Sequence, residues 1–285
     1  MEIKSIQLKA KKDEGIRRRH PWVFSGAIKN LEAGILDGAL VQVHSNKGGH
    51  LGYGHYSKGT SIAIRMISFD ETIPTGSFFQ DKIKQAIAVR QDLGLINSDG
   101  QNTCRLVHAE GDGLPGLIVD YYDRVAVVQT HSLGMHHSLK WIIEALKAEL
   151  KDDLVGVYNK SAKVLRKNGH ATNLDTWVHG NAPENWNAQE HGNAYVIDLV
   201  EGQKTGFFID QRENRLLLGQ LSKGKRVLNT FSYTGGFSVS ALQGGATEVH
   251  SLDSSARALE IGEANVAKNG YSSDVHQSIQ ADALD

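Results

Sequence analysis

A polar turn between an apolar strand and a helix, in residues 225–243, constrains this chain more than any other feature. The apolar pair Val227 and Leu228 predicts the end of a short strand, and the spacing of residues 237–242 predicts a helix. Residues 229–236 lie between them and include two adjacent glycines. Such a turn presents backbone N–H groups and a helix N-terminus to a ligand, while glycine lets the backbone approach it closely. The segment therefore predicts a nucleotide-type site in an α/β domain.

Acidic residues end the strands that we expect next along the chain. Residues 249–253 are typical of a second strand, and Asp253 at its end can bind both hydroxyls of a ribose. Asp253 could instead cap a helix that starts at Ser254 or Ser255, and the two roles are compatible. Asp282 lies where a third strand would end, so it either faces an adenine amino group or is solvated near the terminus. The pattern indicates an adenosine-containing ligand.

A second polar segment, residues 201–214, precedes this turn. It combines charged side chains with two aromatic residues, namely Lys204, Asp210 and Arg212 with Phe207 and Phe208. One interpretation is a polar site backed by aromatic packing. The other is an ordinary helix entry, in which Asp210 is the N-cap, Arg212 and Arg215 form a solvated face, and the Phe pair joins the core.

Cations are concentrated near the N-terminus. The cluster consists of Lys9, Lys11, Lys12, Arg17, Arg18 and Arg19, followed by His20 and Trp22. Lysine and arginine neutralise phosphates, and arginine adds bidentate hydrogen bonding and stacking on bases. A run of charges is often only a solvated face, but this one polarises a chain whose net charge is −1. We therefore expect it to contact RNA.

Two other patterns carry no predicted function. A literal GxGxxG match at Gly111, Gly113 and Gly116 is interrupted by Pro115 and continues into an apolar strand, whereas a dinucleotide site must open a helix. It predicts a sharp turn between strands. Cys104 lies within an apolar strand, where a buried, unreactive thiol is expected. The thirteen histidines include no HExxH motif, so no metal site is predicted.

The composition is that of a cytosolic protein with two or three domains. The chain has 285 residues, of which 40% are hydrophobic and 22% charged, and it has a single cysteine. We find no signal peptide and no apolar run of membrane length. The first part of the chain predicts a small β-barrel, with strands at 3–8, 41–44, 52–56 and 62–67. A mixed region follows, with a helix at 78–93, a meander at 103–130, a helix at 137–150, a strand at 154–158 and a basic helix at 161–167. A βαβ pattern begins at Tyr195. The polar segment 180–192 suggests a domain boundary.

Four segments occur in an order that points to one family: RRRHPWVFSGAI, EGDGLPGLIVD, EGQKTGFFIDQREN and NTFSYTGGFSVSAL. On these segments the chain resembles the bacterial 23S ribosomal RNA (cytosine-5)-methyltransferases that carry an N-terminal PUA domain. The resemblance covers essentially the whole chain and implies an α/β multidomain fold. Its parts would be a PUA β-barrel at 1–72 that binds RNA, a central α+β domain of RNA-modifying enzymes at 73–185, and a partial Rossmann-like methyltransferase domain at 186–285.

The resemblance also implies the cofactor, S-adenosylmethionine (SAM), and the residues that hold it. The turn residues would line the methionine and ribose end: Asn229, Phe231, Ser232, Thr234, Gly235 and Gly236. Asp253 would hold the ribose hydroxyls, and Asp282 would face the adenine. The segment that closes over the cofactor would supply Lys204, Phe207, Asp210 and Arg212. The implied partner is 23S rRNA.

Two features of this family are missing from the sequence. The family's chemistry uses a cysteine thiolate in a loop after a later strand, and an Asp-Pro-Pro-type motif holds the target base. Here the only cysteine is Cys104 and the last proline is Pro183. We therefore expect a chain without the second half of its catalytic domain, through truncation, proteolysis or a shortened gene product. Such a chain would lack turnover and a catalytic residue.

An incomplete sheet has a physical consequence. The strand at 226–229 would normally lie in mid-sheet, so we expect an unpaired edge and an exposed apolar surface, covered by self-association or by another segment. Two rival functions remain open from the sequence. One is methylation of another rRNA atom, such as a guanine nitrogen, and the other is an RNA-binding module without catalysis.

Overall fold

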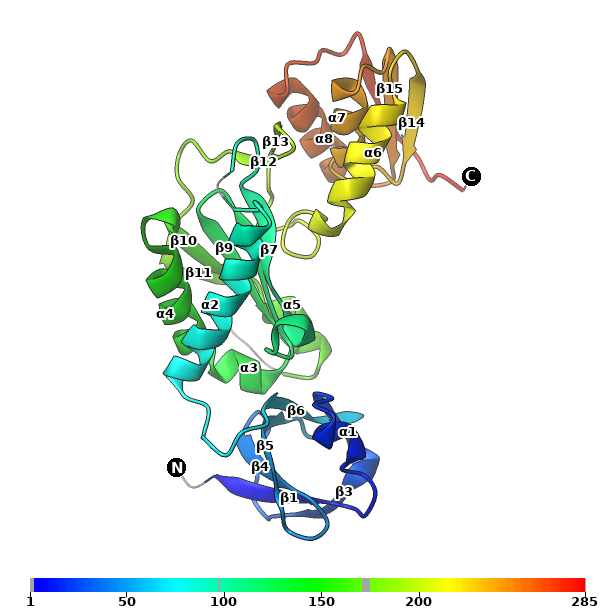
Figure 1. Ribbon diagram of the computed structural model, residues 1–285. Coiled ribbons are helices and arrows are strands. Elements are labelled where there is room, and N and C mark those ends of the chain that lie inside the picture. Colours follow the sequence, from blue (N-terminus) through cyan, green and yellow to red (C-terminus); the bar gives the residue numbers. More distant parts are fainter. Residues whose placement is uncertain (1–2, 97, 171–174, 285) are drawn as a thin grey trace. The chain divides into compact units, whose positions relative to one another are not determined.

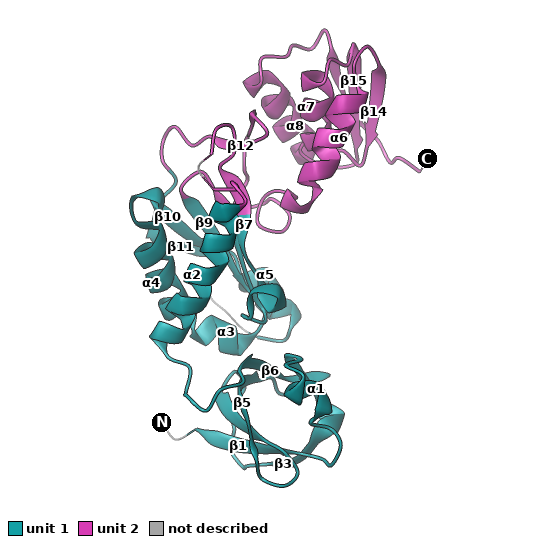
Figure 2. Ribbon diagram, in the orientation of Figure 1, with its two compact units in different colours: residues 1–92, 105–120, 125–182 teal, residues 93–104, 121–124, 183–285 magenta. Residues whose placement is uncertain are grey.

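The computed structural model describes residues 3–96, 98–170 and 175–284. The chain forms two compact units (Figures 1 and 2). The first contains residues 1–92, 105–120 and 125–182, and the second contains residues 93–104, 121–124 and 183–285. The second unit therefore takes two short segments from the middle of the chain.

The N-terminal part of the first unit is a six-stranded sheet that curls around an apolar core (Figure 1). Its strands are β1 (Lys4–Leu8), β2 (Trp22–Phe24), β3 (Ile28–Leu31), β4 (Leu40–His44), β5 (His50–Tyr56) and β6 (Ile62–Ser68), in the order β2-β6-β5-β4-β1-β3. The short elements α1 (Glu14–Arg17) and η1 (Ser25–Ala27) connect them. The predicted barrel is confirmed.

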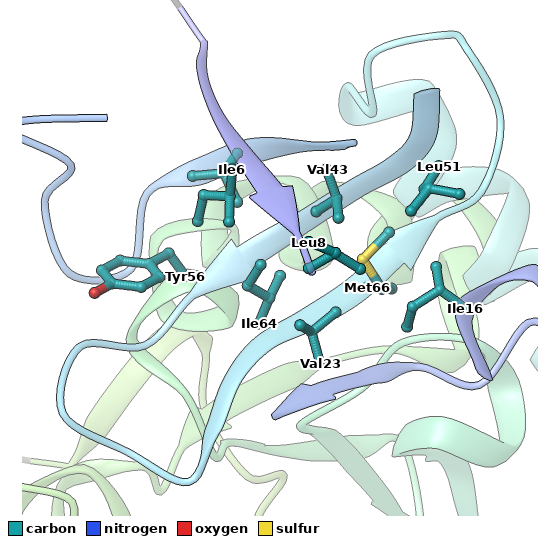
Figure 3. Packing of buried hydrophobic residues seen from close by; sticks show 10 residues of the cluster. Ile6, Leu8, Ile16, Val23, Val43, Leu51, Tyr56, Ile64 and Met66 are labelled. Carbon is teal, nitrogen blue, oxygen red and sulfur yellow. The ribbon is translucent and has the colours of Figure 1, made fainter. Parts of the chain in front are cut away.

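The barrel core comes from alternate residues of these strands. Ile6, Leu8, Val43 and Ile64 are fully buried, and Figure 3 shows them beside Met66 and Val23. Alternation works because successive side chains of a strand point to opposite faces of the sheet. The polar residues between them remain on the outer face.

A five-stranded sheet follows, in the order β11-β10-β9-β8-β7. Its strands are β7 (Thr103–His108), β8 (Leu117–Tyr122), β9 (Val125–Thr130), β10 (Gly156–Asn159) and β11 (Thr176–Gly180). Its helical elements are α2 (Gly76–Asp92), η2 (Ala109–Asp112), α3 (Leu133–His137), α4 (Leu139–Leu150), η3 (Lys151–Asp153) and α5 (Ala162–Lys167). The predicted meander and the helix at 78–93 are confirmed, and α2 packs against α4.

The predicted helix at 137–150 is wrong at its start, because the chain forms two helices that break at Ser138. The Ser132 side chain caps α3, and the Ser138 hydroxyl donates to the carbonyl of Gly134. Serine favours helix ends because its hydroxyl competes for backbone hydrogen bonds. The strand expected at 154–158 likewise begins later, at Gly156.

The last region is a hairpin followed by a βαβαβ unit. The hairpin consists of β12 (Ala188–Glu190) and β13 (Asn193–Tyr195). The elements η4 (Ile209–Gln211) and α6 (Arg212–Leu221) lead into the parallel strands β14 (Arg226–Thr230), β15 (Glu248–Asp253) and β16 (His276–Gln280), which are joined by α7 (Gly236–Gln243) and α8 (Ala256–Lys268). The register pairs Asn229 with Ser251 and Asp253 with Gln280, so the carboxyl ends of the strands share one edge.

The strand β14 lies at the edge of this sheet and, within the described residues, pairs only with β15. Apolar side chains on and near it are exposed: Leu228 by 61%, Phe231 by 66% and Leu221 by 66%. The predicted open edge is therefore confirmed. In the described ranges no helix is long and apolar enough to cross a membrane.

Candidate cofactor site

The turn after β14 has an unusual backbone. Phe231, Tyr233 and Gly235 all have positive φ angles, of 57°, 48° and 71°. Two hydrogen bonds hold this shape, because the Ser232 N–H donates to Leu252 and the Gly235 N–H donates to Ser232. Non-glycine residues in this conformation are strained, and such strain persists only where the surroundings hold it. The turn leads directly into the N-terminus of α7, as predicted.

Close packing leaves little room for a side chain at either glycine of the turn. A Cβ on Gly235 would lie 3.2 Å from the backbone Cα of Gly262 in α8. A Cβ on Gly236 would lie 3.2 Å from Arg215 Cδ and 3.3 Å from the Phe207 ring. The turn is therefore packed against α8 on one side and against the segment at 201–214 on the other.

Asp253 lies at the carboxyl end of β15, beside the turn. Its Oδ2 accepts a hydrogen bond from the Tyr233 N–H at 2.8 Å, and its Oδ1 accepts one from the Ser255 N–H at 2.9 Å. Among the described ion pairs none involves Asp253, so each carboxylate oxygen keeps a lone pair for a ligand hydroxyl. The N-cap of α8 is Ser255, whose Oγ accepts from Ala258. The alternative that Asp253 caps this helix is therefore wrong, because the carboxylate instead braces the turns on either side.

Two buried hydroxyls of the turn have no hydrogen-bond partner within the described residues. Ser232 is 6% exposed and Thr234 is 2% exposed, and neither Oγ nor Oγ1 has a partner. An unsatisfied buried hydroxyl is costly, which is typical of a site completed by a ligand or water. The Asn229 side chain donates to Ser238 Oγ at 2.9 Å. These residues fit a polar ligand such as the methionine and ribose end of SAM.

The segment at 201–214 is anchored by buried arginines. Arg215 makes a bidentate ion pair with Glu190, with both N–O distances 2.7 Å, and its guanidinium lies 4.5 Å from the centre of the Phe207 ring. Arg212 donates to the carbonyl of Thr103 at 2.6 Å. Arg212 and Arg215 are 9% and 2% exposed. Their interpretation as a solvated helix face is therefore wrong, because Glu190 neutralises them in the interior.

The remaining predicted residues lie at the surface. Asp210 is exposed in η4, where its carboxylate accepts from the Gln211 side chain, and the N-cap of α6 is Gln211. The alternative that Asp210 caps α6 is wrong, because the 3-10 turn carries the chain one residue further. Lys204 is exposed, with a φ of 54°. Asp282 is exposed two residues after β16 and accepts from the Leu284 N–H.

The sequence reasoning missed two residues of this site. Tyr233 connects the turn to the segment at 201–214, because its hydroxyl accepts from the Gln203 N–H at 2.8 Å. Burial raises the pKa of the Tyr233 phenol, and the Gln203 N–H opposes this rise. Glu190 holds Arg215. Neither role has a local signal, since both partners are distant in sequence.

The predicted RNA-contacting cations are all exposed, but several have protein partners. Arg17 forms an ion pair with Asp13 at 2.8 Å, and Lys9 donates to the carbonyl of Gly26. The Arg19 guanidinium lies 5.8 Å from the centre of the Phe69 ring. The half-buried Trp22 donates through Nε1 to Glu110 at 2.9 Å. RNA contacts by these residues remain a prediction. Trp22 is fixed in place by its hydrogen bond to Glu110.

The GxGxxG match and Cys104 lie where the sequence predicted, in a turn between strands and in a buried strand. The glycines at 111–116 form a turn between β7 and β8, in which Asp112 makes a bidentate ion pair with Arg90 at 2.7 and 2.8 Å. Cys104 is fully buried in β7. In the part of the chain that the structure describes, no cluster of His, Cys, Asp and Glu could hold a metal ion.

The N-terminal barrel and this turn are those of a SAM-type methyltransferase that also has a barrel domain, and comparison with known proteins agrees. Residues 6–69 match the PUA-like domain family, and residues 105–279 match the family of S-adenosylmethionine-dependent methyltransferases. A protein from Alteromonas mediterranea named ribosomal RNA large subunit methyltransferase I is 38% identical over 281 residues, which is 98% of this chain and 70% of that protein. Its namesake from Aeromonas salmonicida is 36% identical over 282 residues, with 98% and 70% covered. The chain therefore belongs to this family of SAM-dependent methyltransferases with an N-terminal PUA-like domain.

Solved structures give the same result. A protein from Streptococcus mutans assigned as a SAM-dependent methyltransferase superposes with a TM-score of 0.84 at 25% identity, covering 99% of this chain and 72% of that one. A second structure, of a methyltransferase complexed with SAH, superposes with a TM-score of 0.83 at 25% identity, covering 100% and 71%. The family fixes the cofactor as SAM.

Proposed function

We propose that the protein methylates 23S rRNA at C5 of a cytosine, with SAM as methyl donor. The observation that carries the proposal is the Asn229–Gly236 turn. Its Ser232 and Thr234 hydroxyls are buried without a hydrogen-bond partner within the described residues, and Asp253 beside it can still accept hydrogen bonds from a ligand. The rRNA substrate is supported by the printed names of the relatives. The cytosine C5 target is supported by the resemblance of the sequence motifs.

In this proposal each predicted residue has a place around SAM. Asn229, Ser232 and Thr234 contact the methionine and ribose end, and Asp253 accepts from the ribose hydroxyls. The backbone at Gly235 and Gly236 approaches the ligand, with Phe231 beside it. Asp282 faces the adenine, and the segment that closes the site is Lys204, Phe207, Asp210 and Arg212. Phe207 and Arg212 are buried, so in this proposal they support the closing segment from its inner side.

The proposed chemistry requires a thiolate next to the base. A thiolate adds to C6 of cytosine, C5 then takes the methyl group from the sulfonium, and loss of the C5 proton expels the thiolate. The only cysteine, Cys104, is fully buried in β7. We therefore expect the isolated 285-residue chain to bind SAM without turnover.

The other two regions of the protein would bind the RNA. We expect this to take place in the cytoplasm. The PUA-like region at 1–72 and the central region at 73–185 would grip rRNA through the exposed N-terminal cations, and residues 186–285 would present the methyl group. The open edge of β14 is the surface through which a homo-oligomer would form.

Calorimetric titration of the chain with S-adenosylhomocysteine tests the cofactor site. We expect saturable binding that Asp253→Ala weakens about 10–100-fold, because the variant loses charge-assisted hydrogen bonds to the ribose. Asp274→Ala, which removes an exposed acid of the same unit, is the matched control and should bind normally. RNA binding without any cofactor binding would support the rival RNA-binding module and contradict the proposal.

Bisulfite sequencing of 23S rRNA from cells with and without the gene tests the target atom. A C5-methylated cytosine resists deamination, so one protected cytosine should disappear when the gene is deleted. Loss of a methylguanosine instead, detected by mass spectrometry of nucleosides, would favour the guanine alternative.

A further inference from the structure

Tyr233 contacts three parts of the second unit at once. Its N–H donates to Asp253 Oδ2 at 2.8 Å, and its ring packs edge-on against Phe208 with the centroids 5.2 Å apart. Its hydroxyl accepts from the Gln203 N–H at 2.8 Å and donates to the Gly206 carbonyl at 3.4 Å. Through its backbone and its side chain, this one residue joins the turn, the acid beside it and the segment at 201–214.

The hydroxyl holds a tight loop, residues 198–206. Asp198 starts this loop, and its Oδ1 accepts from the N–H groups of Val200 and Glu201 at 3.1 and 2.9 Å. A Cβ on Gly202 would lie 2.2 Å from the Asp198 carbonyl, so the loop is closely wound. Val200, Glu201, Gln203 and Lys204 are exposed, whereas Leu199 and Thr205 are buried. The Thr205 hydroxyl lies 2.8 Å from that of Tyr122, so the base of the loop is anchored and its tip reaches the surface. The Tyr233 hydroxyl, through Gln203 and Gly206, connects this tip to the turn after β14.

The backbone of Tyr233 is strained in a way that suits this role. Its φ of 48° is unfavourable for a residue with a bulky side chain. Such outliers occur at functional sites, where the surrounding structure holds them. In this conformation the N–H donates to Asp253 while the ring packs against Phe208.

We propose that Tyr233 is a positioning residue of the cofactor site, which fastens the 198–206 loop to the turn after β14 and to Asp253 beside it. Without the hydroxyl, the loop opens independently of the turn. With it, Asp253 and the cofactor-closing segment keep a fixed spacing, so part of the ordering cost of binding is met beforehand. The inference rests on the proposed cofactor site and adds a residue to it.

Limited trypsin digestion of Tyr233→Phe tests the loop without any ligand. The variant keeps the ring and loses only the hydroxyl, and the exposed Lys204 lies in the loop that it holds. We expect cleavage after Lys204 to be about 2–10-fold faster than in the wild type, the equivalent of one hydrogen bond. Cleavage after Lys223, an exposed residue outside the loop, should not change. Tyr271→Phe, in the same unit, is the matched control.

The affinity for S-adenosylhomocysteine should fall by a similar factor, about 2–10-fold, in Tyr233→Phe and not in Tyr271→Phe. Wild-type cleavage after Lys204 in Tyr233→Phe would overturn the inference. Equal acceleration at Lys204 and Lys223 would also overturn it, because the hydroxyl would then support overall stability only. If the wild type fails to bind the ligand, the proposed cofactor site falls, and digestion alone decides whether Tyr233 holds the loop.

Discussion

Two glycine-bearing turns of this chain look alike in sequence and differ in what their acids do. In the turn at 109–116, Asp112 is occupied by Arg90 in a bidentate ion pair. At the turn after β14, Asp253 accepts only backbone N–H groups within the described residues. Asp112 is therefore neutralised by a structural ion pair, whereas Asp253 is held in place and keeps lone pairs that can accept hydrogen bonds from a ligand. The literal GxGxxG belongs to the first turn, so the context of a motif identifies a site better than its letters.

The two turns also differ in their anchoring arginines. Arg90 and Asp112 are each 13% exposed, while Arg215 and Glu190 are 2% and 1% exposed. The turn after β14 is stabilised from its buried side. Glu190 binds Arg215 there, and Arg215 packs on the Phe207 ring beside the turn. Variants of the two ion pairs test this difference directly.

The largest expected effect is that of Glu190→Ala. Removing one partner of a buried ion pair leaves an unpaired charge, so we expect a loss of about 3–5 kcal/mol in the free energy of unfolding. Asp112→Ala should cost about 1–3 kcal/mol, because water can partly solvate Arg90. Denaturant titration measures both. Equal losses would mean that the depth of burial does not distinguish the two anchors.

The second largest effect that we expect is a loss of stability at acidic pH, caused by the buried His55 near Arg65. Burial, His137 and Arg65 lower the pKa of His55 to about 4. The folded state therefore keeps His55 neutral while an unfolded histidine protonates below pH ~6.5. The contribution of His55 to the free energy of unfolding is fully present above about pH 6.5. It is lost as the pH falls from about 6.5 to 4, and the full loss is about 3 kcal/mol.

Unfolding of the wild type and of His55→Gln, followed from pH 7.5 to 5, measures this effect. The variant should lose less stability over the range, since it has no group that protonates on unfolding. Parallel pH dependences would assign the acid sensitivity to other groups.

The smallest effects separate the glycines themselves. Gly235→Ala should cost about 1–3 kcal/mol, because its φ is left-handed and the new Cβ meets backbone at 3.2 Å. Gly113→Ala should cost about 1–2 kcal/mol, because its φ is also left-handed but the nearest atom is the flexible Lys82 Nζ at 3.4 Å. Only Gly235→Ala should weaken S-adenosylhomocysteine binding. If Gly113→Ala weakens it equally, the distinction between the turns is lost.

The sequence predicted those parts of the fold that depend on local pattern. The barrel strands alternate, α2 has helical spacing, and the turn after β14 combines an apolar strand end with paired glycines. The burial of Arg212 and Arg215 could not be predicted, because it depends on Glu190, which belongs to a separate hairpin. The role of Tyr233 was hidden for the same reason, and its left-handed backbone runs against the usual preference of tyrosine.

The interleaving of the two units limits how this protein can be dissected. Trp186 and Asn187 hydrogen-bond to Tyr122 and Asp123, and Arg212 reaches the carbonyl of Thr103. A fragment excised at residue 183 would carry these donors into solution without their acceptors. The methyltransferase half is thus not a cassette, and any swap between homologues must transplant residues 93–104 and 121–124 along with it.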